Sequence, residues 1–275
     1  MKFVKNYTFS DQYQIWRLLI SGSDKLIIEL RDTDKKEMFF SCIDIHTGEP
    51  VFSKKQLDEP YWIGIEQIHN DVIFFHKFAK PDMPGHREII AFDIITQEIL
   101  WTSDKYTFLF IFNDKLYVST ESFEGNKYYT LDYKNGKVIE KLIADSTEIA
   151  KLKNIADQSL NYDNYIFPKT FESGNSGVGE NVNILINKEA NDLDIIGNIE
   201  YTEFRGLLLF NMHIKVLDNS LVNKFFVKKL ENGEEIFTEI LNANVNAFAP
   251  DSFFCYKNYV LMLKEKKELL VYKIE

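Results

Sequence analysis

The chain has 275 residues, of which 45% are hydrophobic and 15% are aromatic. This composition excludes a disordered protein, and a chain of this length buries a sizeable core without disulfides or structural metal ions. The formal net charge is −10. A phosphate-binding surface is therefore not expected, because nucleic-acid affinity depends on clustered Lys and Arg, and we predict no nucleic-acid partner.

The N-terminal stretch, residues 1–16, is interrupted by polar residues every few positions and lacks the apolar core of a signal peptide. No run approaches the roughly 20 apolar residues of a membrane-spanning helix. The two cysteines, Cys42 and Cys255, lie in apolar strand patterns, and no disulfide framework is visible. These features predict a cytoplasmic protein without a membrane span.

The first run with strand character is Lys2–Thr8, which belongs to no repeat unit of its own. From Gln14 onward, two classes of tight turn alternate between apolar runs, so each repeat unit has four strands. The first three units are expected at Gln14–Ser21, Lys25–Asp32, Met38–His46 and Glu49–Gln56; at Tyr61–Ile68, Asp71–Phe78, Arg87–Ile95 and Glu98–Ser103; and at Thr107–Asn113, Lys115–Phe123, Lys127–Lys134 and Lys137–Asp145.

One turn motif recurs between two strands of a unit. Its copies are CIDIHTGEPVF (Cys42–Phe52), AFDIITQEILW (Ala91–Trp101), TLDYKNGKVIE (Thr130–Glu140) and VKKLENGEEIF (Val227–Phe237). The first three share an acidic residue, Asp44, Asp93 or Asp132, which can accept hydrogen bonds near the turn. Three copies have glycine in the turn, where a tight hairpin needs positive φ.

The repeat is blurred between Ala144 and Asn198. Ser146–Glu148, followed by Ile149–Leu152, predicts a short capped helix. The candidate strands of a fourth unit are Asn164–Phe171, Asn181–Asn187 and Asp192–Asn198, with a loop at Glu172–Glu180.

The fifth unit is expected at Ile199–Phe204, Leu207–Leu217, Val222–Glu231 and Glu234–Leu241. The last unit has only three strands, Val245–Tyr256, Tyr259–Lys264 and Glu268–Ile274. We expect Lys2–Thr8 to pair with Glu268–Ile274 as the missing outer strand, which removes an exposed sheet edge. The sequence thus predicts an all-β fold. It is a single β-propeller domain over residues 1–275 with six four-stranded antiparallel blades, closed by the N-terminal strand, and five or seven blades are alternatives.

The motif copy with Ala91, Asp93, Thr96 and Trp101 resembles the A-x-D-x-x-T-G-x-x-x-W repeat of quinoprotein-like (pyrroloquinoline-quinone type) propellers, with Gln97 in place of glycine. The run Trp62–Asp93 also resembles an uncharacterised bacterial family of domains of unknown function, which implies no activity. Quinone-dependent enzymes of the superfamily typically use adjacent cysteines, a calcium site and secretion. Because this sequence lacks adjacent cysteines and a signal peptide, we expect no quinone and no other cofactor.

The most unusual loop is His76–Glu88, HKFAKPDMPGHRE, and its two prolines stiffen it by fixing φ. Imidazole and carboxylate groups are suitable metal ligands, so His76, Asp82 and His86 are candidates for a ligand or metal site. The spacing H-x5-D-x3-H matches no zinc motif. The alternative interpretation is a surface hairpin with incidental histidines.

The strand Tyr61–Ile68 is expected to line the propeller channel, with Trp62, Gly64 and Glu66 on one side by alternation. Glu66 would then be a charged anchor for a polar ligand and Trp62 a stacking surface. Alternatively, Trp62 packs between blades, and Glu66 binds water or a neighbouring Arg. Arg17 and Arg31 are further ligand-binding candidates, with ion pairing to neighbouring strands as the alternative.

No catalytic motif is visible, and no residue is assigned a catalytic role. The sequence favours a non-catalytic binding or scaffold protein that uses its loop-rich face and channel mouth, with an unknown protein or small molecule as partner. The alternative is a metal-assisted hydrolase or lyase with a carboxylate and histidine site at the channel mouth, suggested by Glu66 with His76, Asp82 and His86. That enzyme requires Glu66, His76 and His86 to lie within roughly 8 Å of one another, because catalytic groups must reach a common reacting atom.

Overall fold

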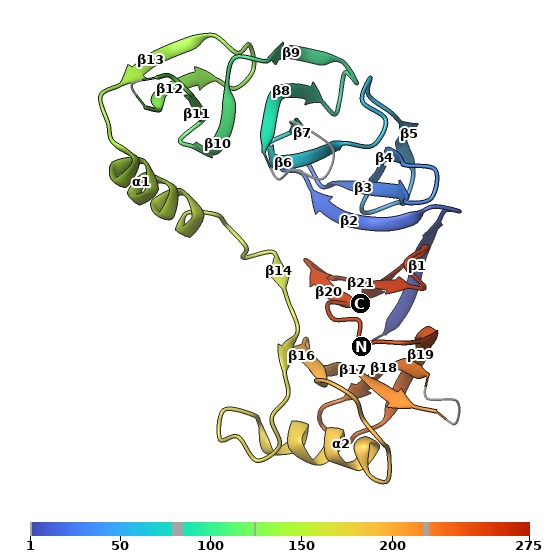
Figure 1. The fold of residues 1–275 in the computed structure, drawn as a ribbon. Helices are drawn as coiled ribbons and strands as arrows, with labels where there is room; N and C mark the ends of the chain where they lie inside the picture. The colour runs from blue at the N-terminus through green and yellow to red at the C-terminus, as the bar shows by residue number, and fades with distance from the viewer. Residues whose placement is uncertain (1, 79–84, 124, 217–219) are drawn as a thin grey trace. The chain divides into compact units, whose positions relative to one another are not determined.

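The computed structural model describes residues 2–78, 85–123, 125–216 and 220–275. These residues form twenty-two strands in antiparallel sheets and two helices, which confirms the all-β prediction (Figure 1). The chain divides into two compact units. Unit 1 contains Met1–Gln12 and Tyr162–Glu275, and unit 2 contains Tyr13–Asn161.

Unit 2 consists of three four-stranded sheets, each built from strands that follow one another along the chain (Figure 1). This is the organisation that the sequence predicts for its first three repeat units. The strands are β2 (Gln14–Ile20), β3 (Lys25–Asp32), β4 (Glu37–Asp44) and β5 (Pro50–Lys55); β6 (Ile63–His69), β7 (Val72–Phe78), β8 (His86–Asp93) and β9 (Ile99–Ser103); and β10 (Thr107–Phe112), β11 (Lys115–Thr120), β12 (Lys127–Asp132) and β13 (Val138–Leu142).

The recurrent acidic residue stabilises the turn between the last two strands of each of these sheets. In all three, Oδ1 of the Asp accepts hydrogen bonds from the backbone N–H groups two and three residues further on. The position after these donors has positive φ, and Gln97 adopts it with φ 60° where the other copies have glycine. Gln97 also bonds to β5, since its Nε2 donates to the Val51 carbonyl at 3.0 Å. That bond offsets part of the strain of a left-handed non-glycine residue.

The central strand β7 shows how alternation builds the core of unit 2. Ile73 and Phe75 pack toward the sheet of β2 to β5, in a cluster with Phe40. Val72 and Phe74 point to the opposite face and pack against side chains of the sheet of β10 to β13. Because both faces are covered, this strand is apolar along most of its length instead of alternating with polar residues.

Helix α1 (Ser146–Gln158) follows β13 and is longer than the short helix that the sequence predicts. Asp145 caps its N-terminus by accepting hydrogen bonds from Thr147 and Glu148, and the Glu148 side chain accepts one in return from the Asp145 backbone. Ile149 and Ala156 are buried in a cluster with Phe110 of β10, so the helix packs against this strand of the sheet.

Unit 1 contains two five-stranded sheets. Their central strands correspond to the fifth and last repeat units predicted from the sequence. The first sheet has the order β15 (Lys169–Thr170), β16 (Glu200–Phe204), β17 (Leu207–Lys215), β18 (Leu221–Lys229) and β19 (Glu235–Val245); the second has the order β1 (Phe3–Ser10), β22 (Glu268–Ile274), β21 (Tyr259–Lys264), β20 (Phe253–Tyr256) and β14 (Tyr165–Ile166).

The expected fourth repeat unit does not form a sheet, so the described residues contain five sheets instead of six. Residues 181–187 lie in helix α2 (Glu180–Ala190), not in a strand. Their apolar residues fit both periods, but Val182 and Ile186 are buried four residues apart while Ile184 is exposed, which is the helical pattern. Between residues 192 and 198 only an isolated bridge forms, at Ile195.

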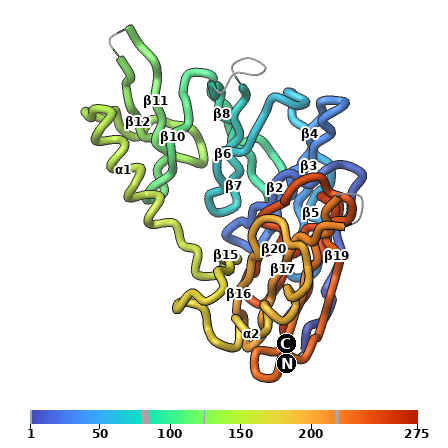
Figure 2. Tube along the Cα trace, turned by 60° about the horizontal axis from the view of Figure 1, so that its bottom comes forward, coloured from blue at the N-terminus to red at the C-terminus, as the bar shows by residue number. Residues whose placement is uncertain are grey.

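The N-terminal strand β1 pairs with β22, as the sequence predicts for Lys2–Thr8 and Glu268–Ile274. Phe3 lies opposite Ile274 and Ser10 opposite Glu268. The two ends of the chain are therefore adjacent (Figure 2), and the Lys2 N–H donates to the Glu275 carbonyl at 2.8 Å. Phe3 also stacks on Tyr272, with ring centroids 4.7 Å apart, and contacts Phe237 of the neighbouring sheet.

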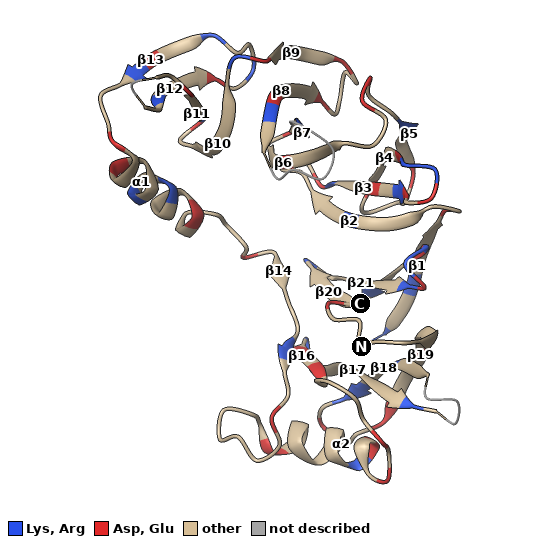
Figure 3. Ribbon diagram, viewed as in Figure 1, with Lys and Arg blue, Asp and Glu red and all other residues tan. Residues whose placement is uncertain are grey.

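Charged residues of both signs occur along helix α1, whereas α2 carries its charges near its two ends (Figure 3). The uncharged middle of α2 packs on the sheet of β15 to β19, against Leu208, Phe210 and Phe226. Among the described residues, neither helix is long and apolar enough to span a membrane.

Candidate functional site

Three neighbouring strands of one sheet bring together Glu66, His76 and His86, which we call the Glu66 cluster. Glu66 lies on β6, where the register with β7 shifts, and the extra residue of such a bulge can re-aim a side chain. His76 lies on β7 opposite Gly64 of β6, and His86 begins β8 opposite Phe78. All three residues belong to unit 2 and lie within strands.

The ligand atoms of the cluster lie within 4.8 Å of one another. Glu66 Oε1 is 2.7 Å from Nδ1 of His86 and 3.0 Å from Nδ1 of His76. The two imidazole rings are stacked, with centroids 3.5 Å apart and planes 8° from parallel. One carboxylate oxygen thus faces a nitrogen of each ring.

His76 is the most deeply buried member, with 5% of its surface exposed. Neither of its ring nitrogens meets the angular criteria of a hydrogen bond, although Nδ1 lies 3.0 Å from Glu66 Oε1, close enough to lower the pKa of the Glu66 carboxyl. A buried polar group without a hydrogen bond costs on the order of 1–3 kcal/mol. The His86 side chain is 36% exposed and connects the cluster to solvent.

Gly64 makes room for the ring of His76. A Cβ atom at this position would lie 2.8 Å from His76 Cε1 and 2.9 Å from Nε2. Nε2 therefore faces the backbone of β6, and Nδ1 is the nitrogen that faces Glu66. The ring of Phe78 stands edge-on to both imidazoles, at 5.0 Å from His76 and 5.6 Å from His86, and gives the cluster an apolar wall.

The Glu66 carboxyl is ionised at neutral pH. Burial raises its pKa, but the contacts with His76 and His86 lower it by more, so that the pKa lies below its usual value. The cluster therefore combines one carboxylate with two imidazoles, a donor set that can bind a cation.

The other candidates from the sequence lie outside this ligand set. Trp62 packs edge-on against Phe78, with centroids 6.3 Å apart, and belongs to the surroundings of the cluster. Arg17 and Arg31 belong to the neighbouring sheet and reach β6, where they donate hydrogen bonds to the carbonyls of Ile65 (2.8 Å) and Ile63 (3.2 Å). Asp82 lies outside the described residues.

Both arginines also surround Glu29, whose side chain is fully buried. Arg31 Nε lies 2.7 Å from one carboxylate oxygen of Glu29, and Arg17 Nε lies 3.8 Å from the other. These ion pairs join β2 and β3 of one sheet, and the carbonyl hydrogen bonds of the two arginines tie that sheet to β6.

The remaining histidines do not join a comparable cluster among the described residues. His46 pairs with Asp24 at 3.0 Å and His69 with Asp114 at 2.8 Å. In His213, Nε2 accepts a backbone N–H at 3.2 Å, and burial lowers the pKa of the ring.

A buried polar network in unit 1 is not apparent from the sequence. Asn223 accepts a hydrogen bond from Asn211 at 3.1 Å and donates to Asn242 at 3.2 Å and Ser252 at 2.8 Å. Glu200 lies nearby on β16, opposite Asn211, and burial raises the pKa of its carboxyl. The one sequence signal is that polar residues interrupt otherwise apolar strands.

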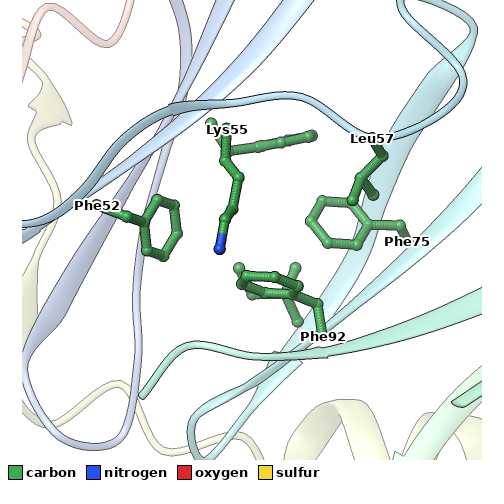
Figure 4. Close-up of a pocket in the computed structure, with 7 residues that line it drawn as sticks. Phe52, Lys55, Leu57, Phe75 and Phe92 are labelled. Atoms are coloured by element: carbon green, nitrogen blue, oxygen red, sulfur yellow. The ribbon is translucent and has the colours of Figure 1, made fainter. Parts of the chain in front are cut away.

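Hollows among the described residues of unit 2 include a small cavity and an open depression. A cavity of about 10 Å³ lies between β5 and the strands β7 and β8, and Figure 4 shows Lys55 pointing between Phe52 and Phe92. It is too small for a ligand, and the Lys55 ammonium is held there by the Gln97 carbonyl at 2.9 Å. An open hollow of about 460 Å³ lies between β12, β13 and the start of α1.

Among the comparisons with known proteins, the family match covers the segment that carries the cluster. A family model described as "Domain of unknown function (DUF4905)" matches residues 20–101. This match confirms the resemblance to a family of unknown function, and it includes β6, β7 and β8. No curated protein matches the chain.

Similar solved structures include a quinohemoprotein alcohol dehydrogenase from Comamonas testosteroni, with 10% identity and a TM-score of 0.32 over 97% of this chain and 44% of the enzyme. A DUF4221 family member from Bacteroides vulgatus has 11% identity and a TM-score of 0.36 over 100% of this chain and 98% of its own. The Dos1 propeller has 11% identity and a TM-score of 0.30 over 95% and 54%. This chain spans less than half the length of the alcohol dehydrogenase, and such distant likenesses carry no argument about function.

Proposed function

We propose that this chain is a non-catalytic binding protein that holds its ligand at the Glu66 cluster. The observation that carries the proposal is His76, a histidine with 5% exposure and two ring nitrogens without hydrogen bonds. An unsatisfied buried group destabilises a protein unless a ligand satisfies it. Because His86 is exposed, a ligand can enter from that side.

The number of acid and base groups at the cluster favours a non-catalytic role over a metal-assisted hydrolase or lyase. Such an enzyme needs ligands for the metal and, in addition, a base or acid that is not a ligand. Among the described residues, the contacts of the two imidazoles with Glu66, Phe78 and Gly64 supply no second base once Glu66 is used as a ligand. Burial also raises the pKa of Cys42 and Cys255 to about 12, so neither thiol is a nucleophile at neutral pH.

We further propose that the five sheets are the blades of one closed propeller domain over residues 1–275, with the Glu66 cluster on the loop-rich face near the channel mouth. The recurrent Asp turns of three sheets and the completion of the last sheet by β1 support this proposal. A closed domain of 275 residues has a radius of gyration of about 19 Å. Small-angle scattering that gives a clearly larger, flexible particle would contradict it.

The substitution His76→Phe tests whether the cluster exists for binding or for stability. Phe keeps a flat ring against Gly64 and His86 but removes the two unsatisfied nitrogens. If the cluster is a ligand site, the free energy of unfolding of the variant without added ligand, measured in urea, will change by less than about 1 kcal/mol, because the gain from removing the unsatisfied nitrogens offsets the lost contact with the Glu66 carboxylate. A loss of more than about 2 kcal/mol would assign the cluster a structural role and overturn the proposal.

A further inference from the structure

We infer that the Glu66 cluster binds one divalent transition-metal ion of the zinc class, with Glu66 and Nδ1 of His76 and His86 as its protein ligands. This inference rests on the binding function proposed above and names the ligand.

The donor set selects the class of ligand. A carboxylate at the centre of the cluster repels anions, so the complementary ligand is a cation. Two imidazole nitrogens with one carboxylate oxygen suit zinc and its transition-metal neighbours, whereas magnesium and calcium prefer oxygen ligands throughout. Glu66, His76 and His86 are also the one group of three potential metal ligands that converge within the described parts of the chain.

The distances in the cluster fit a small ion after a minor adjustment. Ligand atoms about 2.0 to 2.1 Å from zinc in tetrahedral geometry are separated from one another by about 3.3 Å. Glu66 Oε1 is 2.7 Å from His86 Nδ1 and 3.0 Å from His76 Nδ1. These two distances therefore need to lengthen by only a few tenths of an ångström, and all three ligand atoms lie within 4.8 Å of one another.

The ring orientations identify the part that must move. Parallel rings 3.5 Å apart do not direct both nitrogen lone pairs at one point, so the stack must open when an ion enters. His76 is held by Gly64 and Phe78, whereas His86 is more exposed and begins β8. We therefore expect His86 to rotate about its side-chain bonds and exchange its hydrogen bond to Glu66 for a bond to the metal.

Metal binding also satisfies the buried imidazole of His76. Nδ1 of His76, which has no hydrogen bond, becomes a metal ligand, and the Phe78 ring shields the ion from water on one side. Three protein ligands leave the fourth position of a tetrahedral zinc for water or a group from a partner, on the exposed side near His86.

The test is a titration of chelator-treated protein with ZnCl₂ by calorimetry, together with CoCl₂ titrations followed by visible absorption. We expect one ion per chain and Co²⁺ absorption bands typical of tetrahedral nitrogen and oxygen coordination. His86→Ala and Glu66→Gln should each weaken binding by at least about 100-fold, because they remove direct ligands, whose loss exceeds that of outer-shell partners. The matched control is His69→Ala, which removes a histidine paired with Asp114 in the same unit and should leave the affinity within about twofold.

Each outcome bears on one of the two proposals. Failure of both ions to bind, or binding that survives His86→Ala and Glu66→Gln in variants with unchanged circular dichroism, overturns the metal assignment. If His76→Phe nevertheless leaves the stability nearly unchanged, the binding function stands with another ligand. Strong destabilisation by His76→Phe would instead overturn the binding function itself.

Discussion

A methyl group at position 64 would test the packing of the Glu66 cluster without removing any of its polar atoms. Gly64 does not have a positive φ, so Gly64→Ala adds no backbone strain there. The new Cβ would lie 2.8 Å from His76 Cε1 and 2.9 Å from Nε2, and apolar contacts are optimal only near about 3.5 to 4.0 Å. The His76 ring must therefore move by about 0.7 Å or more.

The effect of this displacement on stability can be worked out in sign and size. Moving the ring disturbs its stack with His86 and its approach to Glu66, and overpacking of this kind costs about 1–3 kcal/mol. A glycine-to-alanine change at an unstrained position gains about 0.4–1 kcal/mol from the unfolded state. We thus expect Gly64→Ala to destabilise unit 2 by about 1–2 kcal/mol and to weaken zinc binding.

A double-mutant cycle in urea unfolding isolates the contact. In a His76→Ala background the clash is absent, so Gly64→Ala should become neutral or stabilising there. An equal loss of stability in both backgrounds would refute the reasoning, because the cost of the methyl group would then come from somewhere other than the His76 ring.

Three further results are expected. Phe3→Ala should lower the free energy of unfolding, measured by urea unfolding, by about 2–4 kcal/mol, because it removes the contacts of β1 with two aromatic rings. A change below about 0.5 kcal/mol would contradict that packing. Burial raises the pKa of Glu200 in the folded state, so ionisation of this carboxyl destabilises the fold as the pH rises above its pKa in the unfolded chain. Glu200→Gln should therefore stabilise the protein at pH 7 but not at pH 3.5. An equal gain in stability at both pH values would argue against a raised pKa. With pKa values of about 12, Cys42 and Cys255 should resist iodoacetamide at pH 8 in the folded protein and react after unfolding in urea, as mass spectrometry would report.

The sheets could be predicted wherever local turn chemistry determines the strand pairing. The motifs around Asp44, Asp93 and Asp132 fix hairpins through hydrogen bonds within a few residues, and such signals are readable in one sequence. The pairing of β1 with β22 could be predicted because the last unit lacked a strand. The segment from Asn181 to Asn187 could not, since its apolar residues fit a strand and a helix equally well and packing on a sheet decided between them.

The site shows the same division. The sequence singles out Glu66 and the two histidines. It links the histidines with Asp82 as a ligand site, and it joins Glu66 to them only in the enzyme alternative. Their convergence depends on the bulge at Glu66 and on the space beside Gly64, which are properties of strand register and not of spacing. Gly64 itself was expected only as a small residue facing a channel. Its contact with His76 requires the register of β6 and β7 to be known.

The most direct test of the site is an anomalous difference map at the zinc absorption edge from crystals of the protein grown with ZnCl₂. The account predicts one peak about 2.0 to 2.2 Å from a Glu66 carboxylate oxygen and from Nδ1 of both His76 and His86, with the two rings no longer parallel. Crystals that show the His76–His86 stack intact and no peak beside Glu66 would contradict it.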